Sequence, residues 1–226
     1  YGMHNWPGVP VGTFAIRSGP FFAAADNWTI TVKGHGGHAA KPHETVDPTV
    51  TASHMVIALQ SIASRNVDPT KQVVVSVTSF ETESKAHNVI PSTVTLKGTV
   101  RTLDEDVRDL AERRLSEIAN GTAEMMGATA EVDYLRNYPV MVNAEAETEY
   151  AAAAARAVSG GCDEAPLIMG GEDFAFLSNA RPGAYILVGN GDTAPVHHPE
   201  YNFTDDAIPA GCSWWVEMAQ SRMPLG

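Results

Sequence analysis

The feature that most constrains the fold is a fixed order of strand and helix periodicities within residues 27–135. Helical spacing of apolar residues occurs twice, in residues 52–63 and 107–125. Four expected strands alternate apolar and polar side chains, and they cover residues 27–33, 73–77, 94–100 and 130–134. The order is therefore strand–helix–strand–strand–helix–strand, with one apolar face on each strand. Such a sheet needs helices on one side only, so we predict a ferredoxin-like domain with an open polar face that carries Arg101.

The segments on either side of this domain have a different pattern, with an alanine-rich helix and short apolar runs. The expected strands cover residues 12–17, 166–169 and 184–188, and the expected helices cover residues 144–158 and 208–219. We predict an α/β layer made of residues 1–20 and 138–226, interrupted by a domain of residues 21–137. Few strands and helices make a thin core for such a layer, and we expect an upstream piece to complete it. The start at Tyr1 rather than at an initiator Met agrees with that expectation.

Two local features of the helices are predicted as well. Thr102 and Glu105 have the spacing of a capping box at the start of the second helix of the inserted domain. The C-terminal helix should bury Cys212 as a core thiol. Its expected apolar stripe consists of Ile208, Gly211, Cys212, Trp215, Met218 and Ala219.

The charge of the chain limits its partners. A net charge of −12 argues against nucleic acid and anionic membranes, because both require a basic surface. It leaves room for a small anionic substrate held by one or two local cations. No run approaches ~18 consecutive apolar residues, so no membrane span is expected. The two cysteines, Cys162 and Cys212, lie far apart and fit a reducing compartment.

Four of the eight histidines lie in Gly- or Pro-rich turns, where side chains tend to be functional: His4, His38, His197 and His198. A single histidine in a loop is more often a hydrogen-bonding surface residue than a metal ligand. The order of the surrounding motifs therefore carries more weight than any one of these residues.

Five motifs occur in order along the chain. They are Gly-Met-His-Asn-Trp-Pro-Gly, Gly-Gly-His-Ala-Ala-Lys-Pro-His, Asn-Val-Ile-Pro with Gly-Thr-Val-Arg, Gly-Gly-Glu-Asp-Phe, and His-His-Pro-Glu-Tyr-Asn-Phe. They begin at residues 2, 36, 88 (with 98), 170 and 197. This series resembles the hippurate hydrolase, aminoacylase and indole-acetyl-amino-acid hydrolase family of metal-dependent amidohydrolases, which includes relatives of the carboxypeptidase G type. The resemblance covers essentially the whole chain.

The resemblance implies an architecture and a metal centre. Residues 1–20 and 138–226 would form part of an α/β catalytic domain with two divalent metal ions, and residues 21–137 a ferredoxin-like lid that also dimerises. The metal ligands would be His4 and, of the two adjacent histidines in the late loop, His197. Imidazole suits Zn, Mn, Co or Ni, so the resemblance leaves the metal's identity open.

The resemblance also assigns residues to catalysis and substrate binding. His38 would reach an active site, often that of the partner subunit, and polarise the scissile carbonyl or stabilise the developing oxyanion. A donor aimed at growing negative charge lowers a barrier by ~3–4 kcal/mol. Asn88 and Arg101 match lid residues that bind substrate, and a guanidinium can hold a carboxylate through two parallel hydrogen bonds. From the residues alone, Asn88 could instead cap a turn, and Arg101 could be a solvated residue of an open sheet face.

The loop at residues 170–174 is less specific. Gly171 would face the substrate through its backbone. Glu172 and Asp173 could line the site, or they could begin a short helix, where carboxylates are favourable.

The chain also departs from the family's pattern. The early ligand run of the type Cys-Gly-His-Asp-x-His is absent, and so is the Glu-Glu pair whose first member acts as general base. A catalytic metal requires about three protein ligands besides water, and two histidines fall short of that number. We therefore expect the chain alone to bind metal weakly and to be inactive.

The expected function of the complete protein is hydrolysis of the amide bond of N-acyl amino acids, hippurate-like, in a cytoplasmic homodimer. Two alternatives remain open from the sequence. One is a non-catalytic dimerisation or ligand-binding module built on the same lid. The other is an amidohydrolase that acts on carbamoyl or peptide substrates.

Overall fold

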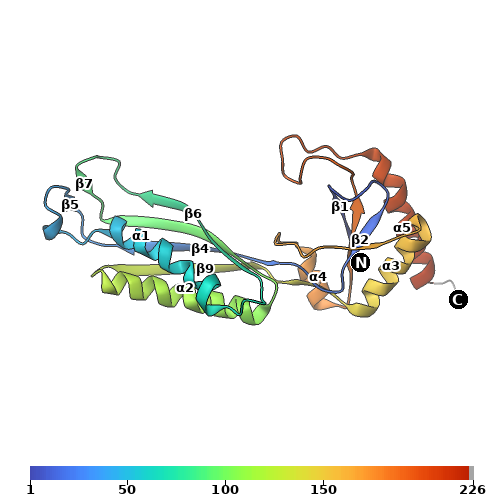
Figure 1. The fold of residues 1–226 in the computed structure, drawn as a ribbon, viewed down its shortest axis with the longest axis horizontal. Coiled ribbons are helices and arrows are strands. Elements are labelled where there is room, and N and C mark those ends of the chain that lie inside the picture. Colours follow the sequence, from blue (N-terminus) through green and yellow to red (C-terminus); the bar gives the residue numbers. More distant parts are fainter. Residues whose placement is uncertain (224–226) are drawn as a thin grey trace. The chain divides into compact units, whose positions relative to one another are not determined.

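The computed structural model describes residues 1–223, which form two compact units of mixed α/β structure (Figure 1). The second unit comprises Ala23–Val140 and Met169–Gly171, and the first unit contains the remaining described residues. Residues 169–171 belong to the second unit, whereas the sequence pattern predicts them in the α/β layer of residues 1–20 and 138–226. Within residues 1–223, no helix has the length and apolar character needed to cross a membrane.

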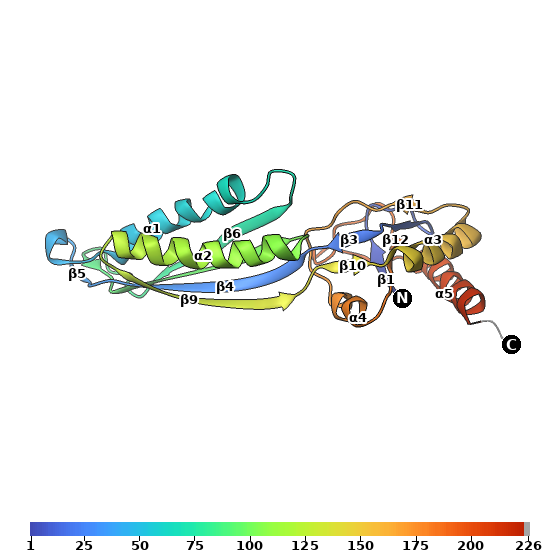
Figure 2. The same cartoon turned by 90° about the horizontal axis from the view of Figure 1, so that it is seen from below.

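The second unit contains an antiparallel four-stranded sheet in the order β6-β8-β4-β9. Both of its α-helices lie on the same side of the sheet, as Figure 2 shows. Along the chain its main elements are β4 (Ala24–Lys33), α1 (Pro48–Leu59), β6 (Val73–Thr82), β8 (Thr93–Thr102), α2 (Glu105–Met125) and β9 (Thr129–Tyr138). A π-helical turn, η2 (Ile62–Asn66), follows α1 and was not expected from the sequence.

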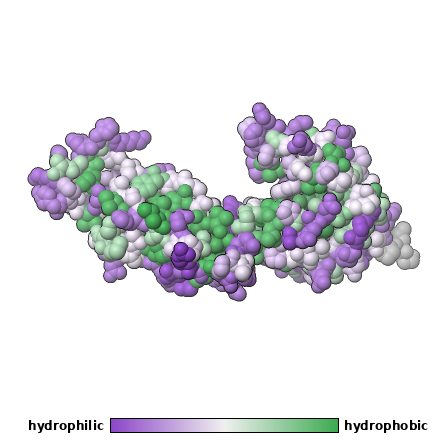
Figure 3. Space-filling model, in the orientation of Figure 1, coloured by the Kyte–Doolittle hydropathy of each residue, from purple (hydrophilic) through white to green (hydrophobic). Residues whose placement is uncertain are grey.

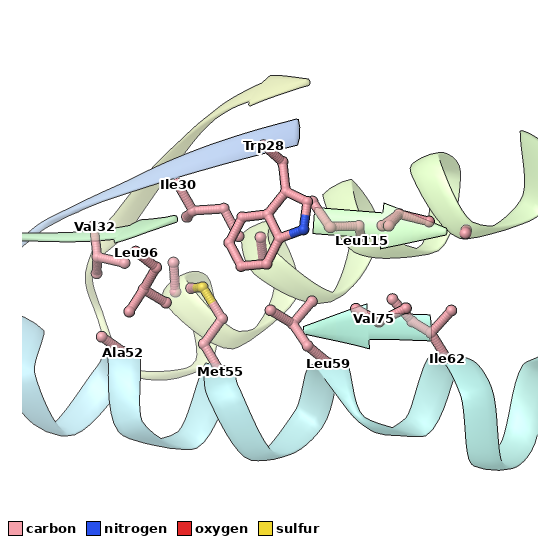
Figure 4. Close-up of a cluster of buried hydrophobic side chains, with 14 of the residues drawn as sticks. Trp28, Ile30, Val32, Ala52, Met55, Leu59, Ile62, Val75, Leu96 and Leu115 are labelled. Carbon is pink, nitrogen blue, oxygen red and sulfur yellow. The ribbon is translucent and has the colours of Figure 1, made fainter. Parts of the chain in front are cut away.

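The core of this unit lies between the sheet and the two helices (Figure 4). Trp28, on β4, packs over Gly98 of β8, and a Cβ atom at Gly98 would lie 2.1 Å from the Trp28 ring. Met55 and Leu59 of α1 and Leu115 of α2 are fully buried in the same cluster. Each such side chain contributes about 1.5–3 kcal/mol through burial. The one-sided apolar pattern of the strands is thus satisfied by one layer of helices.

The N-terminus of α2 is capped by Asp104, so the capping box predicted at Thr102 and Glu105 is wrong. The Asp104 carboxylate accepts hydrogen bonds from the backbone N–H groups of Asp106 and Val107, at 3.0 and 3.3 Å. Thr102 is the last residue of β8 and is fully buried, so its hydroxyl does not cap the helix. The cap falls two residues later because β8 extends further than its apolar alternation indicates.

Two short strands, β5 (Gly37–His38) and β7 (Val89–Ile90), pair at one end of the second unit. We call this end the tip and define it as residues 34–47 and 84–92. A 3-10 turn, η1 (Pro42–Glu44), completes it. The tip extends β4 and β8, because the backbone N–H of Gly34 donates to the carbonyl of Ser92 at 2.9 Å.

The first unit contains a four-stranded sheet in the order β1-β12-β2-β11 and a two-stranded pair, β10-β3. β1 and β12 run parallel, whereas β2 is antiparallel to β12. Its strands are β1 (Gly2–Trp6), β2 (Phe14–Ile16), β3 (Gly19–Phe22), β10 (Met141–Asn143), β11 (Asp163–Glu164) and β12 (Tyr185–Gly189). Its helices are α3 (Glu145–Ser159), α4 (Phe174–Ala180), η3 (Asp205–Ala207) and α5 (Ile208–Arg222).

The strand β12 is buried on both faces. Ile186 and Val188 pack into a core with α3 and α5, whereas Tyr185 and Leu187 pack into a second core that includes α4. This explains why residues 184–188 form a continuous apolar run instead of an alternating one.

The strand predicted at residues 166–169 is wrong. The structure has the two-residue strand β11 just before this segment, and within it only an isolated bridge between Ile168 and Phe22. Pro166 has no backbone N–H to donate, and both Pro166 and Leu167 are exposed. The apolar run is therefore not a buried strand.

The buried stripe of α5 also differs from the prediction. Gly211, Trp214 and Met218 face the core, and the Trp214 indole donates to the Ala151 carbonyl at 3.0 Å. Cys212 is exposed, which corrects the expected buried thiol. Trp215 is 44% exposed although it belongs to the expected stripe. The sequence offers two adjacent tryptophans, and the available carbonyl acceptor selects the first.

Candidate metal and substrate site

Of the candidate metal ligands of the first unit, His4 lies in the middle of β1, two residues before its carboxyl end, and His197 lies in the loop that follows β12. His4 pairs in register with Leu187 of β12, and the two strands end at Trp6 and Gly189. In open α/β sheets, ligands bind beyond the carboxyl ends of parallel strands. The loop of residues 190–204 begins at this edge and contains His197.

The imidazole of His4 is fixed by its own neighbours. Its Nδ1 lies 2.5 Å from the carbonyl oxygen of Asn5, to which it donates a hydrogen bond. In the neutral ring this places the proton on Nδ1 and leaves the lone pair of Nε2 available to a cation. The ring also makes T-shaped contacts with Trp6 and Tyr185, with centroids 5.3 and 6.4 Å apart. His4 is therefore oriented and has the correct tautomer for metal binding.

His197 has a left-handed backbone conformation, with φ of 66°. It is the only non-glycine residue with a positive φ among residues 1–223. Such backbone strain concentrates at functional sites. The adjacent His198 has a local role, because its Nδ1 accepts a hydrogen bond from the Glu200 backbone N–H at 3.1 Å.

A buried asparagine, Asn190, ties this loop to β1. Its side-chain oxygen accepts from the Asn5 amide and from the Thr204 backbone N–H, both at 3.0 Å. Its amide donates to the Thr193 hydroxyl at 2.9 Å and to the carbonyl of Asn202 at 2.8 Å. Asn190 is only 1% exposed, so these bonds form away from solvent.

A second link comes from Tyr201, whose hydroxyl donates to the side-chain oxygen of Asn5 at 2.5 Å. Sequence reasoning missed Asn5, Asn190 and Tyr201 as functional candidates. Asn5 and Tyr201 lie within the quoted motifs, and Asn190 directly follows a buried strand. Polar residues at the carboxyl ends of buried strands were the signal that could have found them.

Glu172 is linked both to the start of α4 and to Tyr185, a neighbour of His4. Its carboxylate accepts a hydrogen bond from the Phe174 backbone N–H at 3.3 Å, at the start of α4. It is also hydrogen bonded to Tyr185, whose ring contacts His4. Burial raises the pKa of the Tyr185 phenol, and the charge of Glu172 raises it further. The phenol therefore remains a proton donor toward the carboxylate at neutral pH.

A metal ion requires several donor side chains grouped within coordination distance of one point. No three His, Cys, Asp or Glu side chains within residues 1–223 are grouped so that they could hold one. The Nδ1 anchor of His4 is nevertheless the arrangement that metal-binding histidines use. The residues present therefore fit a cation as a partial ligand set.

In the second unit, the structure brings His38 and Asn88 together at the tip. His38 pairs with Val89 in the β5–β7 ladder, and the backbone N–H of Ala39 donates to the Asn88 carbonyl at 3.0 Å. The Nδ1 of His38 accepts from the Ala40 backbone N–H at 3.1 Å, so a neutral ring carries its proton on Nε2. Both side chains are exposed, and the tip is hydrophilic at the left end of Figure 3.

Arg101 lies at the opposite end of the same sheet, beside Gly171. Its Nε donates to the Thr99 hydroxyl at 3.1 Å, and the side chain is half-buried. A Cβ atom at Gly171 would lie 2.8 Å from the Ala25 Cβ, 2.9 Å from the Tyr138 ring and 3.3 Å from the guanidinium, so the Gly171 backbone packs closely beside Arg101 and leaves no room for a side chain. Arg101 and Thr93, which adjoins the tip, are eight residues apart on β8. At the usual rise per strand residue, this separation is about 26 Å. Arg101 and Asn88 are therefore not brought together within one copy of the chain.

A histidine oriented by a backbone carbonyl, near the carboxyl end of a parallel strand, is an arrangement that metal sites in α/β folds use. The chain belongs to peptidase family M20/M25/M40, which it matches over residues 1–221. Members of this family are hydrolases that act on amide or peptide bonds.

Individual relatives agree with this assignment. The N-acetylcysteine deacetylase of Bacillus subtilis (strain 168) is 33% identical over 219 residues, which cover 97% of this chain and 57% of the relative. The hippurate hydrolase of Campylobacter jejuni is 33% identical over 223 residues, covering 97% and 58% of the two chains. A solved Bacillus subtilis structure, described as a dinuclear metal-binding peptidase of the M20 family, has a TM-score of 0.81 at 29% identity and covers 98% of this chain and 56% of that one. The chain thus spans somewhat more than half the length of these proteins.

Proposed function

We propose that the protein containing this chain is a metal-dependent amidohydrolase that cleaves N-acyl amino acids of the hippurate type. The observation that carries this proposal is the anchoring of His4. Its Nδ1 donates to the Asn5 carbonyl at 2.5 Å, which leaves Nε2 for a cation, and His4 lies two residues before the carboxyl end of a parallel strand. Membership in a family of amide and peptide hydrolases supports the proposal.

In this proposal His4 and His197 each supply an imidazole to a centre of two divalent ions, which are Zn, Mn, Co or Ni. Bound there, a divalent cation polarises an amide carbonyl and lowers the pKa of water toward neutrality. The other ligands and the general base come from outside this chain. The chain by itself is then inactive, because two imidazoles do not complete a catalytic ligand set.

The role proposed for His38 is to stabilise the oxyanion that forms when water attacks the amide. Its Nδ1 is occupied as an acceptor, so its Nε2–H is the donor that the neutral ring can offer. Asn88, beside it on the tip, offers a second side-chain donor to the substrate. The second unit is, in this reading, a ferredoxin-like lid.

Arg101 is proposed to bind the carboxylate of the amino-acid part of the substrate. A guanidinium holds a carboxylate through two parallel hydrogen bonds, and the Gly171 backbone packs closely beside this guanidinium. The backbone of Gly171 and the carboxylate of Glu172 complete the proposed substrate-binding set.

The distance between Arg101 and the tip supports a proposal about the oligomeric state of the protein. A small N-acyl amino acid cannot span about 26 Å, so one molecule cannot contact Arg101 and His38 of the same copy. We therefore include a homodimer in the proposal, in which the partner subunit's His38 serves the substrate held by Arg101. A cytoplasmic location completes it, since the two cysteines are free thiols.

The proposal is tested with the complete protein by measuring glycine released from hippurate, before and after chelation and after return of Zn, Mn, Co or Ni. We expect release that chelation abolishes and one of the metals restores, and no release by the 226-residue chain alone. Absence of release by the metal-loaded complete protein would contradict the proposal. Release that persists after complete removal of metal would contradict the proposed metal dependence.

A further inference from the structure

A small apolar cavity lies in the first unit between the end of β1 and the loop of residues 190–204. Its volume is about 240 Å³, and it is lined by Trp6, Pro7, Gly8, Thr193, Pro195 and Val196. Among the described residues no charged side chain lines it, and its polar side-chain groups are the Trp6 indole N–H and the Thr193 hydroxyl, which already accepts a hydrogen bond from Asn190. The cavity therefore offers no partner to a charged group and favours an uncharged apolar one.

The walls of the cavity are held in place by backbone hydrogen bonds. The N–H of Gly8 donates to the Gly191 carbonyl at 2.9 Å, and the N–H of Asn190 donates to the Trp6 carbonyl at 2.9 Å. The N–H of Gly191 donates to the Val9 carbonyl at 2.8 Å. These bonds join the two wall segments directly, so the cavity is formed before a ligand enters.

The cavity adjoins both candidate metal ligands. Trp6 lines it and also contacts the imidazole of His4, with ring centroids 5.3 Å apart. Val196, on the other wall, immediately precedes His197. A group bound in the cavity is thus next to the residues that we propose bind the metal. The acyl part of a substrate must lie next to the metal when its carbonyl reacts.

We propose that this cavity binds the acyl group of the substrate and selects an aromatic acyl group of benzoyl size over acetyl. This inference rests on the proposed function, because it names the acyl part of an N-acyl amino acid as the occupant. An apolar cavity of about 150 Å³ accommodates benzene, so the larger volume here admits a phenyl ring with its carbonyl carbon. The Trp6 indole supplies an aromatic wall, and aromatic pairs gain stabilisation beyond their buried area. An acetyl group fills little of the cavity and gains correspondingly less.

The test compares hippurate with N-acetylglycine in the complete protein, using the ratio of their kcat/KM values. We expect hippurate to be preferred by about tenfold or more, since each apolar group accommodated in a pocket contributes about tenfold or more. Val196→Trp, which fills the cavity, should lower this ratio by about tenfold. Val216→Trp is the matched control, because Val216 is an exposed residue of α5 outside the cavity, and it should keep the ratio of the unmodified protein. An equal ratio in Val196→Trp and Val216→Trp would overturn the inference.

A binding measurement separates failure of this inference from failure of the proposed function. The complete protein, labelled with 5-fluorotryptophan, is titrated with benzamide and with acetamide, and the Trp6 resonance is assigned with Trp6→Phe. We expect benzamide to shift the Trp6 signal, acetamide to leave it in place, and Val196→Trp to abolish the benzamide shift. If neither amide substrate is hydrolysed, the proposed function fails and the benzamide titration alone decides about the cavity. A Trp6 signal unmoved by benzamide would overturn the inference, whatever the activity.

Discussion

The Tyr201 hydroxyl donates a hydrogen bond to the side-chain oxygen of Asn5 over 2.5 Å. This bond joins residues that are far apart in the chain, and each lies close in sequence to a candidate ligand. Asn5 follows His4 on β1, and Tyr201 is in the loop that contains His197. The relation between the two ligand-bearing segments therefore depends on polar groups that themselves bind no metal.

Tyr201→Phe should weaken metal binding while leaving the fold intact. The change removes one hydrogen bond, which costs about 1 kcal/mol of stability, and it loosens the loop of His197. Loss of groups that orient metal ligands typically lowers metal affinity by about 10–100-fold. Competition with a fluorescent chelator measures this affinity in the complete protein. Tyr150→Phe, on the exposed surface of α3, is the matched control and should leave the affinity unchanged. Equal affinities in the two variants would remove the proposed role of Tyr201.

Arg101→Lys should raise KM for N-acyl amino acids by about tenfold, with a smaller effect on kcat. A lysine keeps the positive charge but cannot hold a carboxylate through two parallel hydrogen bonds. Steady-state kinetics of the complete protein would separate the two parameters. Arg113→Lys is a suitable comparison, because Arg113 is exposed on α2 and pairs with Glu117 at 3.0 Å. A KM unchanged by Arg101→Lys would argue for a solvated arginine on an open sheet face.

Asp26 is the centre of a buried charge network in the second unit. Its carboxylate accepts from the Nε and Nη2 atoms of Arg108 at 2.8 and 2.6 Å, and from the Tyr134 hydroxyl at 2.9 Å. Burial, followed by the charge of Asp26, raises the pKa of Tyr134, so its hydroxyl stays protonated and continues to donate.

Asp26→Ala should lower the free energy of unfolding of the second unit by about 3–5 kcal/mol, because it removes the buried carboxylate that pairs with Arg108 and leaves this buried cation with the half-exposed Glu105 as its ion-pair partner. Urea denaturation followed by circular dichroism measures the change. Asp133→Ala removes an exposed carboxylate of β9 and should cost no more than about 0.5 kcal/mol. A small effect of Asp26→Ala would show that the arginine finds water or another partner when the carboxylate is absent.

The two thiols should differ in reactivity. Cys212 is exposed on α5, whereas burial raises the pKa of Cys162 to about 11. At pH 8, titration of this chain with a thiol reagent should therefore show one thiol that reacts rapidly. Cys212→Ser should abolish this rapid reaction, and Cys162→Ser should leave it unchanged. Because only the thiolate reacts, labelling of Cys162 should accelerate as the pH rises toward 11. Fast labelling of Cys162 at pH 8 would contradict its burial in the core with α3 and α5.

The sequence predicts most of the strands and helices, because their patterns follow from local geometry. The alternation in residues 27–33 and 94–100 corresponds to β4 and β8, and Gly160 ends α3 in a left-handed conformation with φ of 78°. Which of several similar neighbouring residues caps a helix or faces the core depends instead on tertiary contacts. Asp104 caps α2 in place of Thr102 because β8 continues to Thr102, a feature set by pairing with distant strands.

The grouping of residues in the candidate site also depends on tertiary contacts that the sequence pattern does not reveal. Histidines in turns could be selected from the sequence, but the network of Asn5, Asn190 and Tyr201 joins positions up to 196 residues apart. The separation of Arg101 from the tip likewise follows from strand register and not from any local pattern. Single motifs thus identified candidate residues, whereas their grouping required the fold.

Metal binding by His4 and His197 is measured by the metal content of the purified complete protein and of its variants. Inductively coupled plasma mass spectrometry should find close to two divalent ions per chain in the unmodified protein, as expected for a dinuclear centre. His4→Ala and His197→Ala should each lose at least one ion, whereas His198→Ala, the adjacent control, should retain both. Full metal content in His197→Ala, or loss in His198→Ala alone, would contradict the account.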